Sequence, residues 1–293
     1  MNGESLAEPE APALPGAVAM ALPGIAGWEP PPLLPDPAGG DALLDTLVAM
    51  VAGRRCLLAW ADCARVARMT LAARAAGALS AIVVDPARPP DADRVLEEQG
   101  RWLGLEGEAA RLLRRGRTHG PVPHLGGAHD CDAPLPWWLA AEPGSAETGA
   151  RVGRVDVAVD GSQLIHWPDP LRRLRALAAS GAEHVLFETP LLEEGEAPAG
   201  YLPGSVWYAA GMSAAQSAAI AEYWEQRGVS LPQYRPGTGG VASGQARTSE
   251  TTWWSFADLR GIEHLLRNAG LRLLRSHSIW GGRAAVIVAG RRA

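Results

Sequence analysis

Two short apolar runs on either side of a helical stretch constrain the fold more than any other feature of the sequence. The runs are Cys56–Trp60 and Ala81–Val84, and the segment Arg65–Ala76 between them has a helical composition. The second run ends at an acid, Asp85, and Pro86 then disfavours a helix through this point. This order predicts a strand, a helix and a second strand parallel to the first, as in α/β proteins.

The same alternation continues along the rest of the chain. Helical spacing, polar starts and glycine stops predict helices over residues 41–53, 91–105, 169–180, 213–228 and 255–269. Apolar runs predict strands over residues 154–161 and 183–190, and an antiparallel hairpin over residues 271–280 and 281–291. Residues 117–149 are expected to be mostly loop, with at most a short strand near 122–125. The pattern predicts an α/β domain whose mostly parallel sheet is covered by helices on both faces.

Composition suggests where the domain begins. The chain has 293 residues with 34 Gly and 24 Pro, and residues 1–40 are rich in both. We expect an irregular N-terminal extension over 1–40 and one domain over 41–293. The polar and glycine-rich stretches around 191–252 predict a lid insertion within that domain.

Composition also excludes several classes of function. All 27 basic residues are Arg, so a mechanism that needs a lysine amine is excluded. The formal net charge of −5 argues against nucleic-acid binding, and the chain lacks the run of about 18 apolar residues that a membrane span needs. The three Cys residues are widely separated, which fits a reducing cytoplasm better than a disulfide framework. We expect a cytoplasmic protein with a small-molecule partner, and a homodimer is an open alternative.

Two segments resemble class I S-adenosylmethionine-dependent methyltransferases. VDVAVDGSQLIHWPDPLRRLRALAASGAEHVLFETP is similar to the family's fourth strand, its L-x-H-x-x-D-P loop, the next helix and the fifth strand. TTWWSFADLRGIEHLLRNAGLRLLRS is similar to the late segment of many members that act on small molecules. The resemblance covers roughly residues 41–290. It implies a Rossmann-like class I methyltransferase fold, with a mostly parallel seven-stranded sheet and an antiparallel C-terminal hairpin, and S-adenosylmethionine as the cofactor.

Polar residues follow the expected strands at the edge where open parallel sheets bind ligands. Asp85 lies about 20 residues after Asp62, the spacing at which an acid can hold ribose hydroxyls. A helix-cap or turn acid is the alternative for Asp85. Asp130 or Asp132 follows the expected third strand, where the family places an acid near the adenine amino group. The residues expected to bind the cofactor are Trp60, Ala61, Asp62, Asp85, Asp130, Asp160, Gly161 and Ser162.

The turn after the first strand lacks the glycines that the family carries there. The family usually has D/E-x-G-x-G-x-G, whereas alignment on the strand places Ala59, Ala61, Cys63 and Arg65 near those positions. A Cβ at a positive φ costs on the order of 1–2 kcal/mol per residue, and the added atoms could narrow the cofactor pocket. Asp62 tolerates a left-handed backbone better than most residues. The motif leaves open whether the cofactor binds as in the family, binds in an altered way or does not bind.

His166 and Tyr208 are the candidate catalytic residues. His166 lies in the loop after the fourth strand, where the family's fold brings the acceptor and the sulfonium together, and a histidine there can act as a general base. The alternative is that His166 hydrogen-bonds the loop and orients Asp169. Aromatic faces attract a sulfonium cation and stack on planar acceptors, although they also serve in core and lid packing. The residues expected to bind the substrate are Gln163, Trp207, Trp253 and Trp254.

One further group of side chains has the chemistry of metal ligands. His119, His124 and His129, followed by Asp130 and Cys131, have the spacing H-x4-H-x4-H-D-C. This spacing matches no tight zinc pattern, because structural zinc sites pair their ligands at shorter intervals. We expect no metal.

Three functions therefore remain in competition. The first is methyl transfer from S-adenosylmethionine to a small metabolite or natural-product intermediate. The second is a cyclase, known within the same fold, that consumes S-adenosylmethionine to form azetidine-2-carboxylate and methylthioadenosine. The third is a catalytically inactive methyltransferase-like scaffold. The glycine-poor turn bears on the choice between the third function and the other two, because only the first two require the cofactor to bind there.

Overall fold

A computed structural model describes residues 41–59, 63–86, 88–117, 137–164, 169–192, 202–212, 252–279, 282 and 284–292. The helices in this part of the chain are α1 (Ala42–Met50), α2 (Cys63–Ala75), α3 (Ala92–Trp102), α4 (Glu106–Arg117), α5 (Ala146–Val152), α6 (Pro170–Ala179) and α8 (Leu259–Asn268). The strands are β1 (Arg55–Ala59), β2 (Ser80–Val84), β3 (Trp138–Leu139), β4 (Val157–Gln163), β5 (His184–Pro190), β6 (Val206–Met212), β7 (Thr252–Ala257), β8 (Leu271–Ile279) and β9 (Ala284–Arg291).

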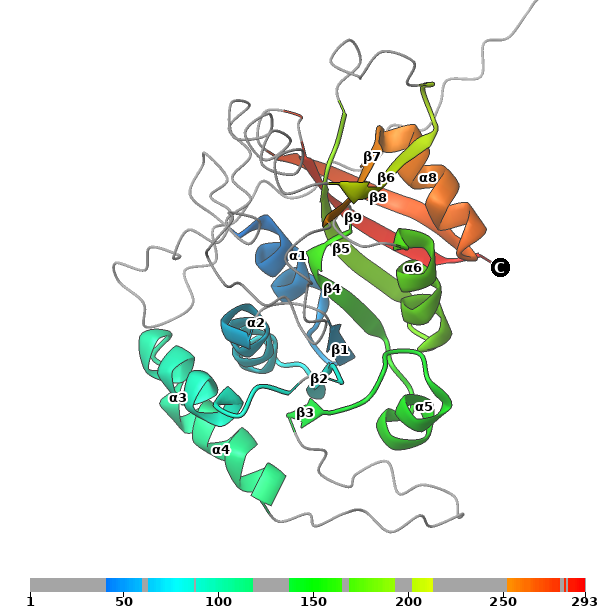
Figure 1. The fold of residues 1–293 in the computed structure, drawn as a ribbon. Helices are drawn as coiled ribbons and strands as arrows, with labels where there is room; N and C mark the ends of the chain where they lie inside the picture. Colours follow the sequence, from blue (N-terminus) through cyan, green and yellow to red (C-terminus); the bar gives the residue numbers. More distant parts are fainter. Residues whose placement is uncertain are drawn as a thin grey trace, which may run out of the picture.

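Seven of these strands form one sheet in the order β3-β2-β1-β4-β5-β9-β8 (Figure 1). β1 pairs in parallel with β2 on one side and with β4 on the other, so that Cys56 stands opposite both Ala81 and Val157. β9 pairs antiparallel with both β5 and β8. The Rossmann-like class I methyltransferase fold expected from the sequence is therefore confirmed, including the antiparallel C-terminal hairpin.

The sheet is covered on both faces because its strands are apolar on both sides. Alternate residues of β1 belong to different cores: Cys56 and Leu58 pack with α1, α2, α3 and α4, whereas Leu57 and Ala59 pack with α5, α6 and α8. Figure 1 shows α1 and α2 on one side of the sheet and α5, α6 and α8 on the other. Two-sided burial of a parallel sheet explains the continuous apolar runs in the sequence.

Helix α2 is buried along most of its length. Residues 65–73 are all buried, because α2 lies against the sheet and also contacts α1, α3 and α4. Its arginines extend from the buried helix to neighbouring elements. The Arg68 guanidinium lies 5.7 Å from the centre of the Trp102 ring, and Arg74 Nε lies 3.1 Å from Glu108 Oε1. These contacts tie α2 to α3 and α4.

Several helix ends follow the capping signals in the sequence. The Asp41 carboxylate accepts a hydrogen bond from the Leu44 N–H at 3.0 Å, and Asp169 accepts one from the Arg172 N–H at 2.8 Å. Pro170 occupies the first turn of α6, where its missing N–H costs no helical hydrogen bond. The predicted starts of α1 and α6 are confirmed.

In residues 117–149, which were expected to be mostly loop, the described part contains a strand that was not predicted. Helix α4 reaches Arg117, and this segment also contains β3 and the start of α5. β3 pairs with β2 over only two residues, with Val83 opposite Trp138. Such a short strand between prolines has no alternating pattern to reveal it. Residues 122–125, where a short strand was expected, lie outside the described residues.

The second correction concerns residues 255–257, which were expected to begin a helix. They belong to β7, which pairs antiparallel with β6 in a separate two-stranded sheet. α8 begins only after Asp258, whose carboxylate accepts hydrogen bonds from the N–H groups of Gly261 and Gly204. Among the described residues, no helix is long and apolar enough to cross a membrane.

Candidate functional site

The chain order reverses between β1 and β4, and the candidate site lies at the carboxyl ends of the strands around this point. β1 leads towards β2 on one side, and β4 leads towards β5 on the other. Asp85 directly follows β2, and Asp160 stands opposite Ala59, the last residue of β1. Open α/β sheets bind ligands in the crevice at such a switch point. The fold therefore brings Asp85, Asp160 and Gly161 to one edge of the sheet.

Asp85 is held by main-chain contacts with β3. Its N–H donates to the Leu139 carbonyl at 3.1 Å, and its carbonyl accepts from the Trp138 indole N–H at 3.1 Å. The residue is only 1% exposed, and its Oδ2 atom is buried. A ligand can therefore contact this carboxylate only after the atoms that cover it have moved. The predicted role of Asp85 in binding ribose hydroxyls stays a prediction.

Asp160 forms a buried ion pair with Arg173 of α6. Arg173 Nη2 donates to Asp160 Oδ1 at 3.1 Å, and Arg173 Nε lies 2.7 Å from Asp160 Oδ2. The side chains are 3% and 0% exposed for Arg173 and Asp160 respectively. Because both carboxylate oxygens face the guanidinium, Asp160 would share its charge between Arg173 and any ligand that reaches it.

The carboxyl end of β4 contains a bulge. Asp160 stands opposite Phe187 of β5, but Gln163 stands opposite Glu188, the very next residue of β5. β4 therefore has two residues, Gly161 and Ser162, that β5 does not match. A bulge interrupts the hydrogen-bond ladder and redirects the strand, and bulges are over-represented next to active sites.

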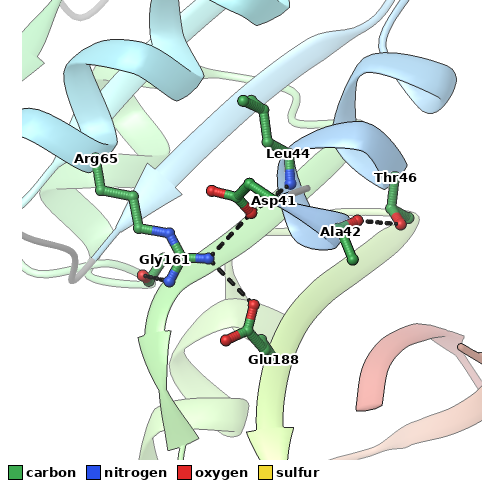
Figure 2. Close-up of polar contacts among 7 residues, drawn as sticks. All are labelled: Asp41, Ala42, Leu44, Thr46, Arg65, Gly161 and Glu188. Atoms are coloured by element: carbon green, nitrogen blue, oxygen red, sulfur yellow. Dashed lines mark hydrogen bonds and ion pairs between the residues drawn. The ribbon is translucent and has the colours of Figure 1, made fainter. Parts of the chain in front are cut away.

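Arg65 of α2 reaches across the sheet edge to this bulge (Figure 2). Its Nη1 donates to the Gly161 carbonyl at 3.0 Å, and its Nη2 lies 3.2 Å from Glu188 Oε2 and 3.3 Å from Asp41 Oδ1. The guanidinium thus joins β4, β5 and the start of α1. The Arg65 and Glu188 side chains are only 7% and 3% exposed, so their charges interact away from bulk water.

The described charged groups at this edge carry more negative than positive formal charge. The carboxylates are Asp41, Asp85, Asp160 and Glu188, and the guanidinium groups are Arg65 and Arg173. Nearby in α1, burial and then the Asp41 carboxylate raise the pKa of Asp45 above its usual value. Carboxylates at this edge can attract a ligand that carries a positive charge.

The structure also places the glycine-poor turn relative to the elements around it. Ala59 is the last residue of β1, Cys63 begins α2, and Arg65 lies in the first turn of that helix. Arg65 was considered in the sequence only as a departure from the glycine pattern. An arginine within the apolar helix CARVARMTLAARA was the available signal that a buried polar partner existed, because buried charges require one.

The remaining predicted site residues are placed only in part. Trp60, Ala61, Asp62, Asp130 and His166 lie outside the described residues. The backbone of Ser162 and Gln163 lies at the end of β4. The backbone of Trp207 and Tyr208 lies in β6, and that of Trp253 and Trp254 in β7, while the side chains of these six residues are not described.

Asp130 was expected to follow the third strand of the sheet. The strand that pairs with β2 is β3, and β3 comes after Asp130 in the sequence. The first acid after β3 is Glu142, which is exposed and was missed by sequence reasoning. The pair of tryptophans before Leu139 was the signal for this strand, but the flanking prolines favoured a loop.

The two-stranded sheet brings the predicted aromatic residues of β6 and β7 together along the backbone. Trp207 stands opposite Phe256, and Tyr208 stands opposite Ser255. The ribbon is tied to the main sheet because the Leu192 N–H, just after β5, donates to the Ala257 carbonyl at 2.9 Å. Within the described part of the chain, no group of three His, Cys, Asp or Glu side chains could hold a metal ion.

Comparison with known proteins gives matches at the level of folded structure. No protein-family model and no curated protein matches the chain. Magnesium protoporphyrin IX methyltransferase from Synechocystis PCC 6803, with bound SAH, has 12% identity and a TM-score of 0.42, over 85% of this chain and 82% of that chain. The Burkholderia thailandensis 1,6-didemethyltoxoflavin-N1-methyltransferase, with bound 1,6-didemethyltoxoflavin and S-adenosylhomocysteine, has 14% identity and a TM-score of 0.44, over 88% of this chain and 82% of that chain.

A third match is the CcbJ methyltransferase from Streptomyces caelestis, with 14% identity and a TM-score of 0.43 over 88% of this chain and 93% of that chain. Identities of this size describe a likeness of fold alone. The fold assignment itself rests on the strand order of the sheet and on the antiparallel position of β9.

Proposed function

We propose that this protein binds S-adenosylmethionine at the carboxyl edge of its sheet and transfers the methyl group to a small metabolite or natural-product intermediate. The observation that carries the proposal is the position of two carboxylates, Asp85 and Asp160, at the carboxyl ends of the strands beside the switch point between β1 and β4. Their negative charge would attract a sulfonium cation. The phosphates of a dinucleotide, the other common ligand of such folds, would be repelled by it and would find no glycine-rich turn.

Polar groups on both sides of the switch point could contact the proposed ligand. Asp85, after β2, can accept hydrogen bonds from ribose hydroxyls once the atoms that cover it have moved. On the β4 side, the main chain at Gly161 and Ser162 can contact the other end of the ligand. We propose Glu142, after β3, as the acid nearest the adenine ring in place of Asp130.

The chemistry asks little of the protein beyond positioning. The acceptor atom forms a bond to the methyl carbon, the carbon–sulfur bond breaks with its electron pair left on sulfur, and the acceptor loses a proton. In-line displacement depends strongly on the alignment of the reacting atoms, so holding both reactants supplies much of the acceleration. His166 is the proposed base, with Tyr208 as the second catalytic candidate. Gln163, Trp207, Trp253 and Trp254 are the proposed acceptor-binding residues.

The direct test is calorimetric titration of the full chain with S-adenosylmethionine and S-adenosylhomocysteine, with NAD as the control ligand. We expect heat from both adenosyl ligands and none from NAD. Tighter binding of S-adenosylmethionine than of S-adenosylhomocysteine is expected because only the former carries the sulfonium charge. Folded protein that gives no heat at millimolar adenosyl ligand would contradict the proposal and favour the inactive scaffold.

A second measurement separates transfer from consumption of the cofactor. The protein is incubated with S-adenosylmethionine alone, and the products are separated by liquid chromatography and mass spectrometry. We expect no turnover until a small-molecule acceptor is added. Methylthioadenosine formed without any acceptor would contradict methyl transfer and support the cyclase.

A further inference from the structure

Arg65 has a role that the proposed chemistry does not use. It lies in the first turn of α2, near a position where the family that the sequence resembles carries a glycine. Its guanidinium nevertheless reaches β4, on the other side of the switch point. Figure 2 shows the side chain extending from α2 to Gly161, Asp41 and Glu188. A long, charged arginine side chain therefore lies near a position where the family's pattern has a glycine.

The contacts of Arg65 fall on both sides of the β4 bulge. Gly161, whose carbonyl accepts from Nη1 at 3.0 Å, is the first of the two unmatched residues of β4. Glu188, which lies 3.2 Å from Nη2, is the β5 residue that stands opposite Gln163 directly after the bulge. One guanidinium group thus connects the beginning of the bulge on β4 to the β5 residue that marks its end.

The geometry of the guanidinium explains why an arginine serves here. Its planar fork presents separate N–H donors at fixed angles, so that one nitrogen can donate to a carbonyl while another faces two carboxylates. A lysine ammonium of similar length is a single point charge and cannot hold both partners in this arrangement. Because the bulge interrupts the ladder between β4 and β5, the main chain at Gly161 and Ser162 depends on contacts from outside the sheet.

We propose that Arg65 is a positioning residue that fixes the β4 bulge and so holds Ser162 and Gln163 in place for ligand binding. This inference rests on the proposed function for its ligand, but the effect on the backbone does not depend on that ligand. A glycine-rich turn after β1 would let the backbone approach the ligand directly. In this chain Arg65, in the first turn of α2, would instead affect ligand binding by holding the end of β4.

The test compares Arg65→Lys with the matched variant Arg74→Lys. Arg74 also lies in α2, is similarly shielded, and also combines a carboxylate partner, Glu108, with backbone carbonyl partners, those of Ala78 and Leu79. Its two carbonyl partners lie just before β2, at the opposite edge of the sheet from the bulge, and Glu108 lies in α4. Both variants keep the charge and lose the fork, so general damage to α2 affects them alike.

The first readout is hydrogen–deuterium exchange of the ligand-free protein, in peptides that divide β4 at Asp160. In Arg65→Lys we expect exchange protection after Asp160 to fall by at least about tenfold, with residues 157–159 unchanged. Arg74→Lys is expected to leave both parts of β4 as in the wild type. Unchanged protection after Asp160 in Arg65→Lys, or an equal loss in both variants, would overturn the inference.

The second readout is the affinity for S-adenosylhomocysteine, measured by calorimetry. Arg65→Lys is expected to weaken binding by at least about tenfold, and Arg74→Lys by less than about twofold. Equal affinities in the two variants would overturn the positioning role. If the wild type itself does not bind the ligand, the proposed function fails, and the exchange measurement alone then decides whether Arg65 fixes the bulge.

Discussion

The buried pair Asp160–Arg173 allows one effect on stability to be worked out from the structure. Arg173→Leu removes a guanidinium that lies 2.7 Å and 3.1 Å from the two carboxylate oxygens of a side chain that is 0% exposed. Two unit charges about 4 Å apart attract by about 4 kcal/mol at an effective dielectric constant of about 20. Removal of one member of a buried ion pair leaves the other charge without that compensation, which typically costs about 3–5 kcal/mol.

We therefore expect Arg173→Leu to lower the free energy of unfolding by about 3–5 kcal/mol, a large share of the roughly 5–15 kcal/mol that stabilises an average domain. Urea denaturation followed by circular dichroism measures this difference. Arg172→Leu, at the exposed neighbouring position of α6, is the control and should change the free energy of unfolding by no more than about 0.5 kcal/mol.

The double variant Asp160→Val with Arg173→Leu tests whether the cost arises from the unpaired charge. Because the second substitution removes the buried carboxylate that has lost Arg173, the double variant should be more stable than Arg173→Leu by at least about 1.5 kcal/mol. The reasoning is refuted if Arg173→Leu costs less than about 1 kcal/mol. It is also refuted if the double variant is no more stable than Arg173→Leu.

Three further outcomes are expected from other parts of the structure. Asp85→Ala should weaken S-adenosylhomocysteine binding at least tenfold, about 1.4 kcal/mol by calorimetry, and unchanged affinity would mean that the ribose binds elsewhere. Gly144→Ala should lower the thermal midpoint of unfolding far more than Gly104→Ala. Both glycines have a positive φ, but only a Cβ at Gly144 would lie 2.3 Å from the Ala176 carbonyl oxygen. Equal shifts of the midpoint would contradict this. Burial, and then the Asp156 carboxylate, raise the pKa of Cys56 to about 12, so about 1 in 10,000 of these thiols is ionised at pH 8. Iodoacetamide should therefore modify Cys56 only after unfolding. Rapid labelling of the folded protein, read by peptide mass spectrometry, would show that the thiol is accessible and ionised.

The alternation of strands and helices could be predicted from the sequence because each element carries its own local signal. Asp41 and Asp169 mark helix starts, and the apolar run before Asp85 marks β2. β3 could not be predicted in this way, because two residues are too few to show a period and prolines surround them. The last three residues of β7, 255–257, were assigned to a helix because they run directly into the helical pattern of α8.

The candidate site was predictable at the level of the sheet edge but not of its contacts. Parallel strands bring Asp85 and Asp160 to one edge in any fold of this class, so that their sequence positions after apolar runs were sufficient. The network around Arg65 joins residues 41, 65, 161 and 188 through side-chain directions and a bulge. The arginine in α2 indicates that a buried polar partner exists, but no local pattern shows which residues that partner would be. The roles of His166, Tyr208 and the tryptophans stay predictions.

The interior position of β9 has a consequence for how the chain folds during synthesis. β5 receives its second neighbour only when residues 284–291 have been made, and until then its apolar residues Val185, Leu186 and Phe187 lie on an open strand edge. At about 5–20 residues per second, the ribosome needs roughly 5–20 s to add the intervening chain. During that interval the nascent protein exposes an unpaired apolar strand edge, the kind of surface that promotes aggregation and that chaperones bind.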